Sequence, residues 1–185
     1  MIFRLTQKLA KKIKEAPNRS YPAGPNLYTD WSAHLFTAQR VQYIIVSNTA
    51  SLYSLVSYAR GILDFSGFIK YFINYMAEYM SKDGYEFLFR GFIASEAKEV
   101  IFSKLTNRHV IGSVNNLVYF AKCYLIESQL SPFEASQQIN QVPMSYLDYG
   151  NPKEAFAKMK PITGNTQRDN NDCDFNLPDG PVCSS

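Results

Sequence analysis

Histidine is the scarcest of the residues that carry acid–base chemistry, because this chain of 185 residues contains two, His34 and His109. A histidine acid–base pair, or a metal site with two histidine ligands, would therefore need both of them. Neither lies in an HExxH segment, and the chain contains no GxSxG segment and no glycine–lysine phosphate loop. The sequence predicts no bound metal and no cofactor.

Cysteine is also scarce, with three residues at Cys123, Cys173 and Cys183. They lack the paired CxxC spacing of a structural zinc site. We expect Cys123 to lie on the core side of a helix. Cys173 and Cys183 fall in a polar C-terminal segment, where they either stay free or close a loop in an oxidising compartment, and the sequence does not decide between these states.

Long apolar runs are missing as well. No window of the chain reaches the roughly 18 to 20 apolar residues that a transmembrane helix requires. The N-terminal segment Met1–Leu9 lacks both the continuous apolar stretch and the small-residue cleavage site of a secretory signal. We therefore expect no membrane partner and a cytoplasmic location.

Positive charge is concentrated in one short segment. Residues 1–19 hold six basic side chains and one acid, Glu15, which leaves 13 basic and 15 acidic side chains in the rest of the chain. A surface that wraps a nucleic-acid duplex normally has a larger basic surplus. This balance argues against duplex binding and leaves a small phosphate contact open.

Apolar periodicity predicts an α+β fold with a small, mainly antiparallel sheet packed against several helices. We expect one domain over residues 1–160 and a flexible polar tail over residues 161–185. The three central strands should form an antiparallel meander, with Ala33 and Leu35 on one face of the first of them and His34 and Phe36 on the other. The predicted strands are 2–5, 31–38, 41–48, 52–59 and 99–104; the predicted helices are 6–13, 68–82, 85–93, 112–127, 132–140 and one after Asn151–Pro152.

One polar segment, residues 106–116, joins a predicted strand to a predicted helix that begins near Gly112. Backbone N–H groups and the guanidinium of Arg108 would meet there at a helix N-terminus, which suits an anion. Gly112 and Ser113 would let a ligand approach the backbone, and Asn115 would orient it.

The same segment also has a structural interpretation. Asn107 or Ser113 would cap the helix and Gly112 would permit a tight turn. The sequence leaves both interpretations open.

Four segments of the chain resemble a bacterial family of unknown function, which is also found attached to plasmid-type open-reading-frame proteins. They are Met1–Leu9, Trp31–Leu35, Tyr43–Asn48 and residues 106–116. The resemblance spans about residues 1–125 and implies no activity. It implies that eight residues belong to one pattern, which we take as the candidate ligand-binding site: Trp31, His34, Asn48, Asn107, Arg108, Gly112, Ser113 and Asn115.

Two positions depart from the family pattern. His109 stands where the family has serine, and Asn116 stands where it has aspartate. A proton shuttle at His109 and a carboxylate at residue 116 therefore gain no support from the resemblance.

The sequence leaves three functions open. The first is a binding or interaction module of the bacterial cytoplasm with a small anion-accepting pocket at the strand–helix junction, whose partner is a protein or a small anionic ligand. The second is a phosphoester- or nucleotide-directed enzyme that uses His34, Arg108 and His109. The third is a weak binder of RNA or single-stranded nucleic acid that uses the N-terminal lysines and exposed tyrosines.

Overall fold

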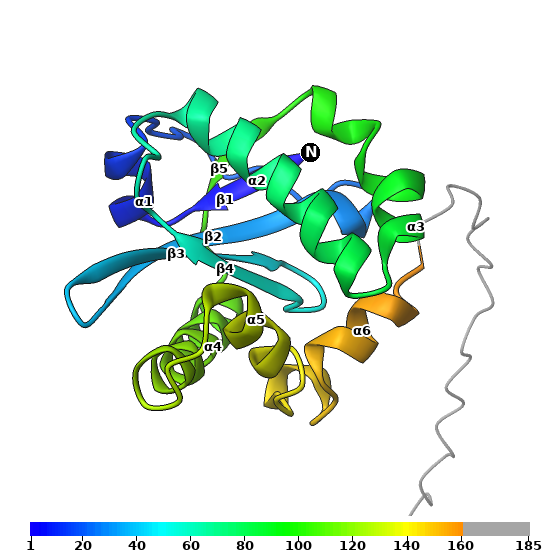
Figure 1. The fold of residues 1–185 in the computed structure, drawn as a ribbon. Helices are drawn as coiled ribbons and strands as arrows, with labels where there is room; N and C mark the ends of the chain where they lie inside the picture. Colours follow the sequence, from blue (N-terminus) through cyan, green and yellow to red (C-terminus); the bar gives the residue numbers. More distant parts are fainter. Residues whose placement is uncertain (161–185) are drawn as a thin grey trace, which may run out of the picture.

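A mixed five-stranded sheet lies at the centre of the fold. In the structure, a computed structural model that describes residues 1–160, the strands are β1 (Ile2–Leu5), β2 (Asp30–Ala38), β3 (Val41–Asn48), β4 (Ser54–Tyr58) and β5 (Ile101–Lys104). Their order is β4-β3-β2-β1-β5, and helices cover both faces (Figure 1). The predicted α+β class is confirmed. The predicted tail, with Cys173 and Cys183, lies outside the described residues.

The longest ladders of the sheet are antiparallel and join β2 to β3 and β3 to β4. Gln39 and Arg40 connect β2 to β3 with φ angles of 43° and 68°, the left-handed values that a tight two-residue hairpin turn requires. The predicted antiparallel meander is therefore confirmed. The short strand β1 pairs in parallel with both β2 and β5.

Side chains of β2 alternate between two separate hydrophobic cores. Ala33 and Leu35 enter the first core, whereas Phe36 and Ala38 enter the second. Apolar side chains on both faces are what a strand covered from both sides requires. Among the helices that contribute to these cores, α1 (Gln7–Lys12) and α2 (Phe65–Lys82) pack into the first, and α4 (Arg108–Ile126) and α5 (Pro132–Ile139) pack into the second.

Polar side chains cap the first turns of several helices. The side chain of Asp64 accepts a hydrogen bond from the Gly67 N–H at the start of α2. Ser131 and Glu134 form a reciprocal capping box at the start of α5. The side-chain oxygen of Asn151 accepts a hydrogen bond from the Glu154 N–H at the start of α6 (Pro152–Lys158). Within residues 1–160, no helix combines the length and the apolar character needed to cross a membrane.

Some predicted elements differ in length from the observed ones. Leu52, predicted to lie in a strand, has a φ of 60° and belongs to the turn before β4. The predicted helix 85–93 consists of a short α3 (Glu86–Leu88) followed by a π-helical turn (Phe89–Ile93).

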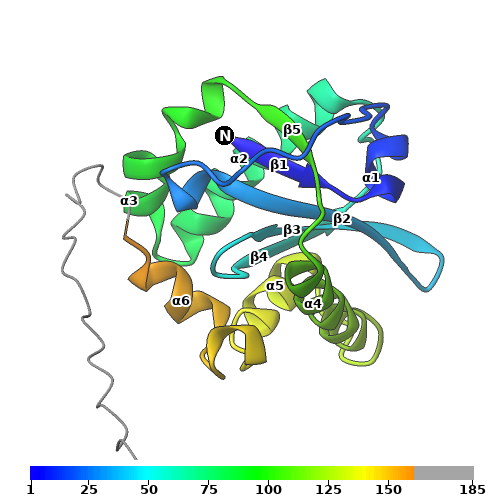
Figure 2. The ribbon, with the colours of Figure 1, turned by 180° about the vertical axis from the view of Figure 1, so that it is seen from behind.

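The neighbouring parallel strands β1 and β5 send their helices to opposite faces of the sheet. β1 leads into α1 on the side of the first core, and β5 leads into α4 on the side of the second (Figure 2). A crevice opens between two such helices at the carboxyl ends of the strands, and ligands of open α/β sheets bind at this kind of switch point. The topology therefore marks the carboxyl ends of β1 and β5 as the place to look for a site.

A buried ion pair joins β1 to β2. The Nε and Nη2 atoms of Arg4 donate to Oδ1 and Oδ2 of Asp30 over 2.7 and 2.6 Å. Nη1 of the same guanidinium donates to the carbonyl oxygen of Tyr21 over 2.7 Å, so the loop between α1 and β2 is bound to it as well. The two residues are 8% and 3% exposed. Neither charge could be left alone at this depth without a large desolvation cost.

We expect Asp30→Asn to lower the free energy of unfolding by about 3–5 kcal/mol, because it leaves the guanidinium of Arg4 buried without its counter-charge. Urea denaturation measures the loss. The matched control is Glu78→Gln, which breaks the exposed pair between Glu78 and Lys82 and should cost about 1 kcal/mol or less. Equal losses in the two variants would contradict a dominant role for the buried pair.

Candidate functional site

The helix at the polar junction begins after Asn107, which confirms the structural interpretation in which Asn107 is the cap. Asn107 is its N-cap, and the side-chain oxygen of Asn107 accepts hydrogen bonds from the N–H groups of His109 and Val110 over 3.0 and 3.3 Å. The predicted start near Gly112 is therefore wrong by about one turn. Asn107 and Gly112 are both boundary signals, and an isolated glycine is tolerated inside a helix.

Gly112 and Ser113 consequently lie inside α4. A methyl group added at Gly112 would meet no atom within 4 Å, so no close approach of another segment depends on this glycine. The Ser113 hydroxyl donates to the carbonyl oxygen of His109, one turn earlier, over 2.9 Å. Both residues are accounted for by ordinary helical structure.

Trp31 and Asn48, two of the eight predicted site residues, lie in the interior. The indole N–H of Trp31 donates to the Tyr28 carbonyl oxygen over 2.9 Å. The amide group of Asn48 donates to the Leu27 carbonyl oxygen over 2.9 Å and accepts from the Ser51 N–H over 3.0 Å. Their polar groups are thus bonded to the backbone that surrounds the start of β2 and the β3–β4 turn.

The remaining predicted residues fall at two separate places on the surface. Arg108, Gly112 and Ser113 line a shallow hollow of about 360 Å³ at the start of α4, together with His109. His34 and Asn115 line a different and larger hollow between α1 and α4. The structure therefore brings His34 and Asn115 together and does not bring the eight residues into one site.

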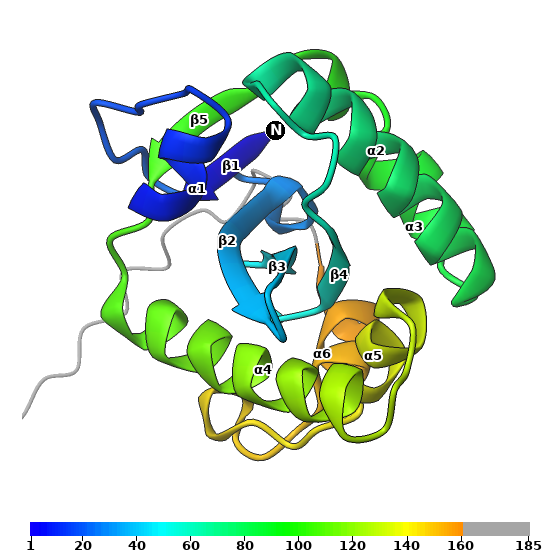
Figure 3. The ribbon, with the colours of Figure 1, turned by 60° about the vertical axis from the view of Figure 1, so that its left-hand side comes forward.

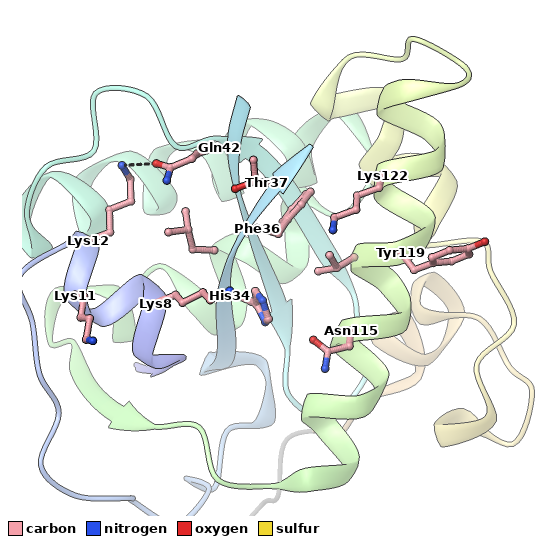
Figure 4. A pocket seen from close by; sticks show the side chains of 12 residues that line it. Lys8, Lys11, Lys12, His34, Phe36, Thr37, Gln42, Asn115, Tyr119 and Lys122 are labelled. Carbon is pink, nitrogen blue, oxygen red and sulfur yellow. Dashed lines mark hydrogen bonds between the residues drawn. The ribbon is translucent and has the colours of Figure 1, made fainter. Parts of the chain in front are cut away.

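The hollow that His34 and Asn115 line, which we call the basic cleft, has a volume of about 820 Å³. His34 and Phe36 of β2 lie at its floor, with side chains of α1 on one side and of α4 on the other (Figure 4). None of its lining residues, all within the described part of the chain, is acidic. The positively charged side chains that line it are Lys8, Lys11, Lys12 and Lys122.

A second hollow, which we call the switch-point crevice, adjoins the basic cleft and has a volume of about 1000 Å³. The two share Lys8, Lys11 and His34, and the crevice adds Lys14, Lys104 and one acid, Glu15. Leu5, Thr6, Leu105 and Thr106 also line it, which places it at the carboxyl ends of β1 and β5.

The hydroxyl oxygen of Thr6 is buried in the wall of the switch-point crevice and has no hydrogen-bond partner among residues 1–160. Thr6 is the N-cap residue of α1, yet its side chain makes no capping bond. Buried hydroxyl groups nearly always have a partner, so the Thr6 hydroxyl is an exception to the usual pattern.

Positive potential in the basic cleft acts on His34. Burial lowers the pKa of His34 below its ordinary value, because a charged imidazolium loses hydration there. The ammonium groups of Lys8 and Lys122 lower the pKa further. Charges from two different helices therefore converge on one imidazole, which is held in its neutral form near neutral pH.

The lysines of the two hollows were only partly foreseen from the sequence. The basic N-terminal segment was assigned to a possible nucleic-acid contact, and Lys8, Lys11 and Lys12 belong to it. Lys104 and Lys122 carry no local signal in the sequence, because their positions in the walls of the two hollows depend on how β5 and α4 pack. Among residues 1–160, no three side chains of histidine, cysteine, aspartate or glutamate gather as metal ligands would.

We expect Asn107→Ala to destabilise the protein by about 1 kcal/mol, because two N–H groups of α4 lose their cap. Arg108→Ala should change the free energy of unfolding by about 0.5 kcal/mol or less, since Arg108 is exposed. Urea denaturation of both variants measures the difference. A large loss in Arg108→Ala alone would show that Arg108 has a structural role.

Comparisons with known proteins agree with the resemblance seen in the sequence. No curated protein and no solved structure gives a significant match. A family model described as "Domain of unknown function (DUF6933)" matches residues 2–155. The match extends beyond the predicted residues 1–125 and includes α5 and the start of α6. The chain therefore belongs to this family of domains of unknown function.

Proposed function

We propose that this protein is a binding module for an anionic ligand that carries phosphate or carboxylate groups. The observation that carries the proposal is that six lysines line two adjoining hollows, which share His34 and whose lining residues, all among 1–160, include a single acid, Glu15. The lysines come from α1 and the turn after it, from the end of β5, and from α4. They are Lys8, Lys11, Lys12, Lys14, Lys104 and Lys122.

Electrostatics favours an anion in these hollows. Ammonium groups that the fold brings together repel one another, and a bound anion replaces that repulsion by attraction. Concave sites lined by one sign of charge also concentrate ligands of the opposite sign. Burial is the main cause of the lowered pKa of His34, and the positive charges of Lys8 and Lys122, which lower this pKa further, support the same conclusion.

The position of the hollows in the fold supports the proposal as well. The switch-point crevice lies where α1 and α4 leave neighbouring parallel strands on opposite faces of the sheet. Leu105 and Thr106 place it beside the junction between β5 and α4, and the positive end of the α4 dipole lies at that junction.

Binding is better supported than catalysis. His34 makes no side-chain hydrogen bond to a residue among 1–160, and no acid lies in the basic cleft to orient its ring. His109 and Arg108 line the separate hollow at the start of α4, so the three residues of the enzyme hypothesis do not line one pocket. The basic cleft also has one exposed aromatic side chain, Tyr119, whereas single-strand binding uses successive stacking platforms.

Tripolyphosphate is a suitable first probe. At about 100 times its dissociation constant, a ligand adds roughly 2.7 kcal/mol to the stability of the folded state, and differential scanning fluorimetry detects such a change. We expect the wild type to gain a clear thermal shift. The Lys8→Gln/Lys122→Gln variant should lose most of it, because both lysines flank His34.

A matched control has the same net charge as that variant. Lys70→Gln/Lys98→Gln removes two exposed lysines that line neither hollow, and it should keep the thermal shift. Absence of a shift in the wild type, across tripolyphosphate and citrate, would overturn the proposed function. An equal loss of the thermal shift in the two variants would show that the shift depends on the net charge of the protein and not on the lysines of the two hollows.

The pKa of His34 provides an independent check. In the free protein, an NMR titration should give a pKa below 6.5, the ordinary value of histidine. Lys8→Gln should raise it, because removing a neighbouring positive charge makes protonation easier. Bound tripolyphosphate should raise it more strongly by stabilising the imidazolium. A pKa that does not respond to the anion would place the binding site away from His34.

A further inference from the structure

The floor of the basic cleft is the open edge of a strand. The last residue of β1, Leu5, pairs with Ala33, and the Thr6 N–H then donates to the Ala33 carbonyl oxygen over 3.1 Å. β2 continues to Ala38, and no other strand within residues 1–160 pairs with it on this side. About five residues of β2 therefore extend past its neighbour, a length of about 16 Å.

The backbone of this extension has a defined orientation. Ala38 and Val41 flank the two-residue turn, so they form a hydrogen-bonded pair, and hydrogen-bonded pairs recur at every second residue of an antiparallel ladder. The N–H and C=O groups of Leu35 and Thr37 consequently point away from β3. Among residues 1–160, no turn, loop or side-chain hydrogen bond reaches them, and both residues line the basic cleft.

The charged walls lie on either side of this edge. Leu35 enters the first core, on the face of the sheet that α1 covers. Thr37 lies two residues further along β2 and therefore on the same face. Phe36 enters the second core, under α4. Figure 3 shows the edge of β2 between α1 and α4. An extended chain laid along the edge would direct alternate side chains toward Lys8 and Lys11 on one face and toward Lys122 on the other.

We propose that the ligand of the basic cleft is an acidic peptide segment of a partner protein, which binds in an extended conformation and adds a strand to the open edge of β2. This inference rests on the proposed anion-binding function and specifies the class of partner. Backbone hydrogen bonds to Leu35 and Thr37 provide affinity for any extended chain, and the flanking lysines select acidic side chains.

The same charges disfavour a second copy of this chain as the occupant. Pairing of two β2 edges would bring two sets of lysines against each other, and lysines beside exposed edges are a common protection against self-pairing. An acidic strand neutralises these charges instead of adding to them. The apolar side chains of Val118 and Tyr119 also line the cleft and can contact a non-acidic residue of the peptide.

The probe is a blocked peptide of four Asp-Val repeats, titrated into the full chain by isothermal calorimetry. Hydrogen exchange, followed by NMR, should show slower exchange of the Leu35 and Thr37 amides when the peptide is bound. Tripolyphosphate, which has no backbone to pair with the edge, should leave their exchange unchanged. This pair of measurements requires no variant of the protein.

Thr37→Pro tests the edge directly. Thr37 is exposed and its N–H points away from β3, so proline removes an edge donor and leaves the β2–β3 ladder intact. Affinity for the peptide should fall by about tenfold or more, whereas affinity for tripolyphosphate should stay the same. Thr37→Val keeps the N–H and should bind both probes as the wild type does. If Thr37→Pro does not fold, amide exchange in the wild type decides the question.

The outcomes separate the inference from the proposed function. Binding of tripolyphosphate without binding of the peptide would overturn the inference and leave the anion site standing. Peptide binding that Thr37→Pro does not weaken, or that leaves the Leu35 and Thr37 amides unprotected, would overturn it as well. If neither probe binds, both proposals fail together.

Discussion

The buried pair of Arg4 and Asp30 is the interaction on which the arrangement around the cleft depends. A guanidinium and a carboxylate at this depth require each other, so the start of β2 must lie beside β1 in one register. The guanidinium also binds the carbonyl oxygen of Tyr21, in the loop that returns from α1. One ion pair thereby fixes β1, β2 and the segment between them, and with them the side of the sheet on which the lysines of α1 lie.

The unequal lengths of β1 and β2 turn this arrangement into a possible binding surface. β1 ends at Leu5 because the chain turns into α1 directly after Thr6, and β2 is left with an open edge over its second half. α1 and α4 lie on opposite faces of the sheet and bound this edge with lysines. A strand edge and a concentration of positive charge therefore coincide, and the two proposals above depend on that coincidence.

Several residues that the sequence marked as a possible site have sufficient structural roles. Trp31 and Asn48 bind backbone groups in the interior, and Asn107 caps α4. A family pattern contains residues that build the fold as well as residues that contact ligands, and the pattern alone does not separate them. Burial and hydrogen-bond partners separate the two kinds of residue. On that basis His34 and Asn115 are the predicted residues that line the basic cleft.

Local chemistry in the sequence determined the α+β class, the antiparallel meander and the helices that begin at Pro132 and after Asn151, because alternation and capping act over a few residues. It did not decide the start of α4, where Asn107 and Gly112 are competing local signals. The basic cleft was decided by the tertiary structure alone. Lys8 and Lys122 are far apart in the chain, and they meet at His34 because the sheet order places α1 and α4 on either side of β2.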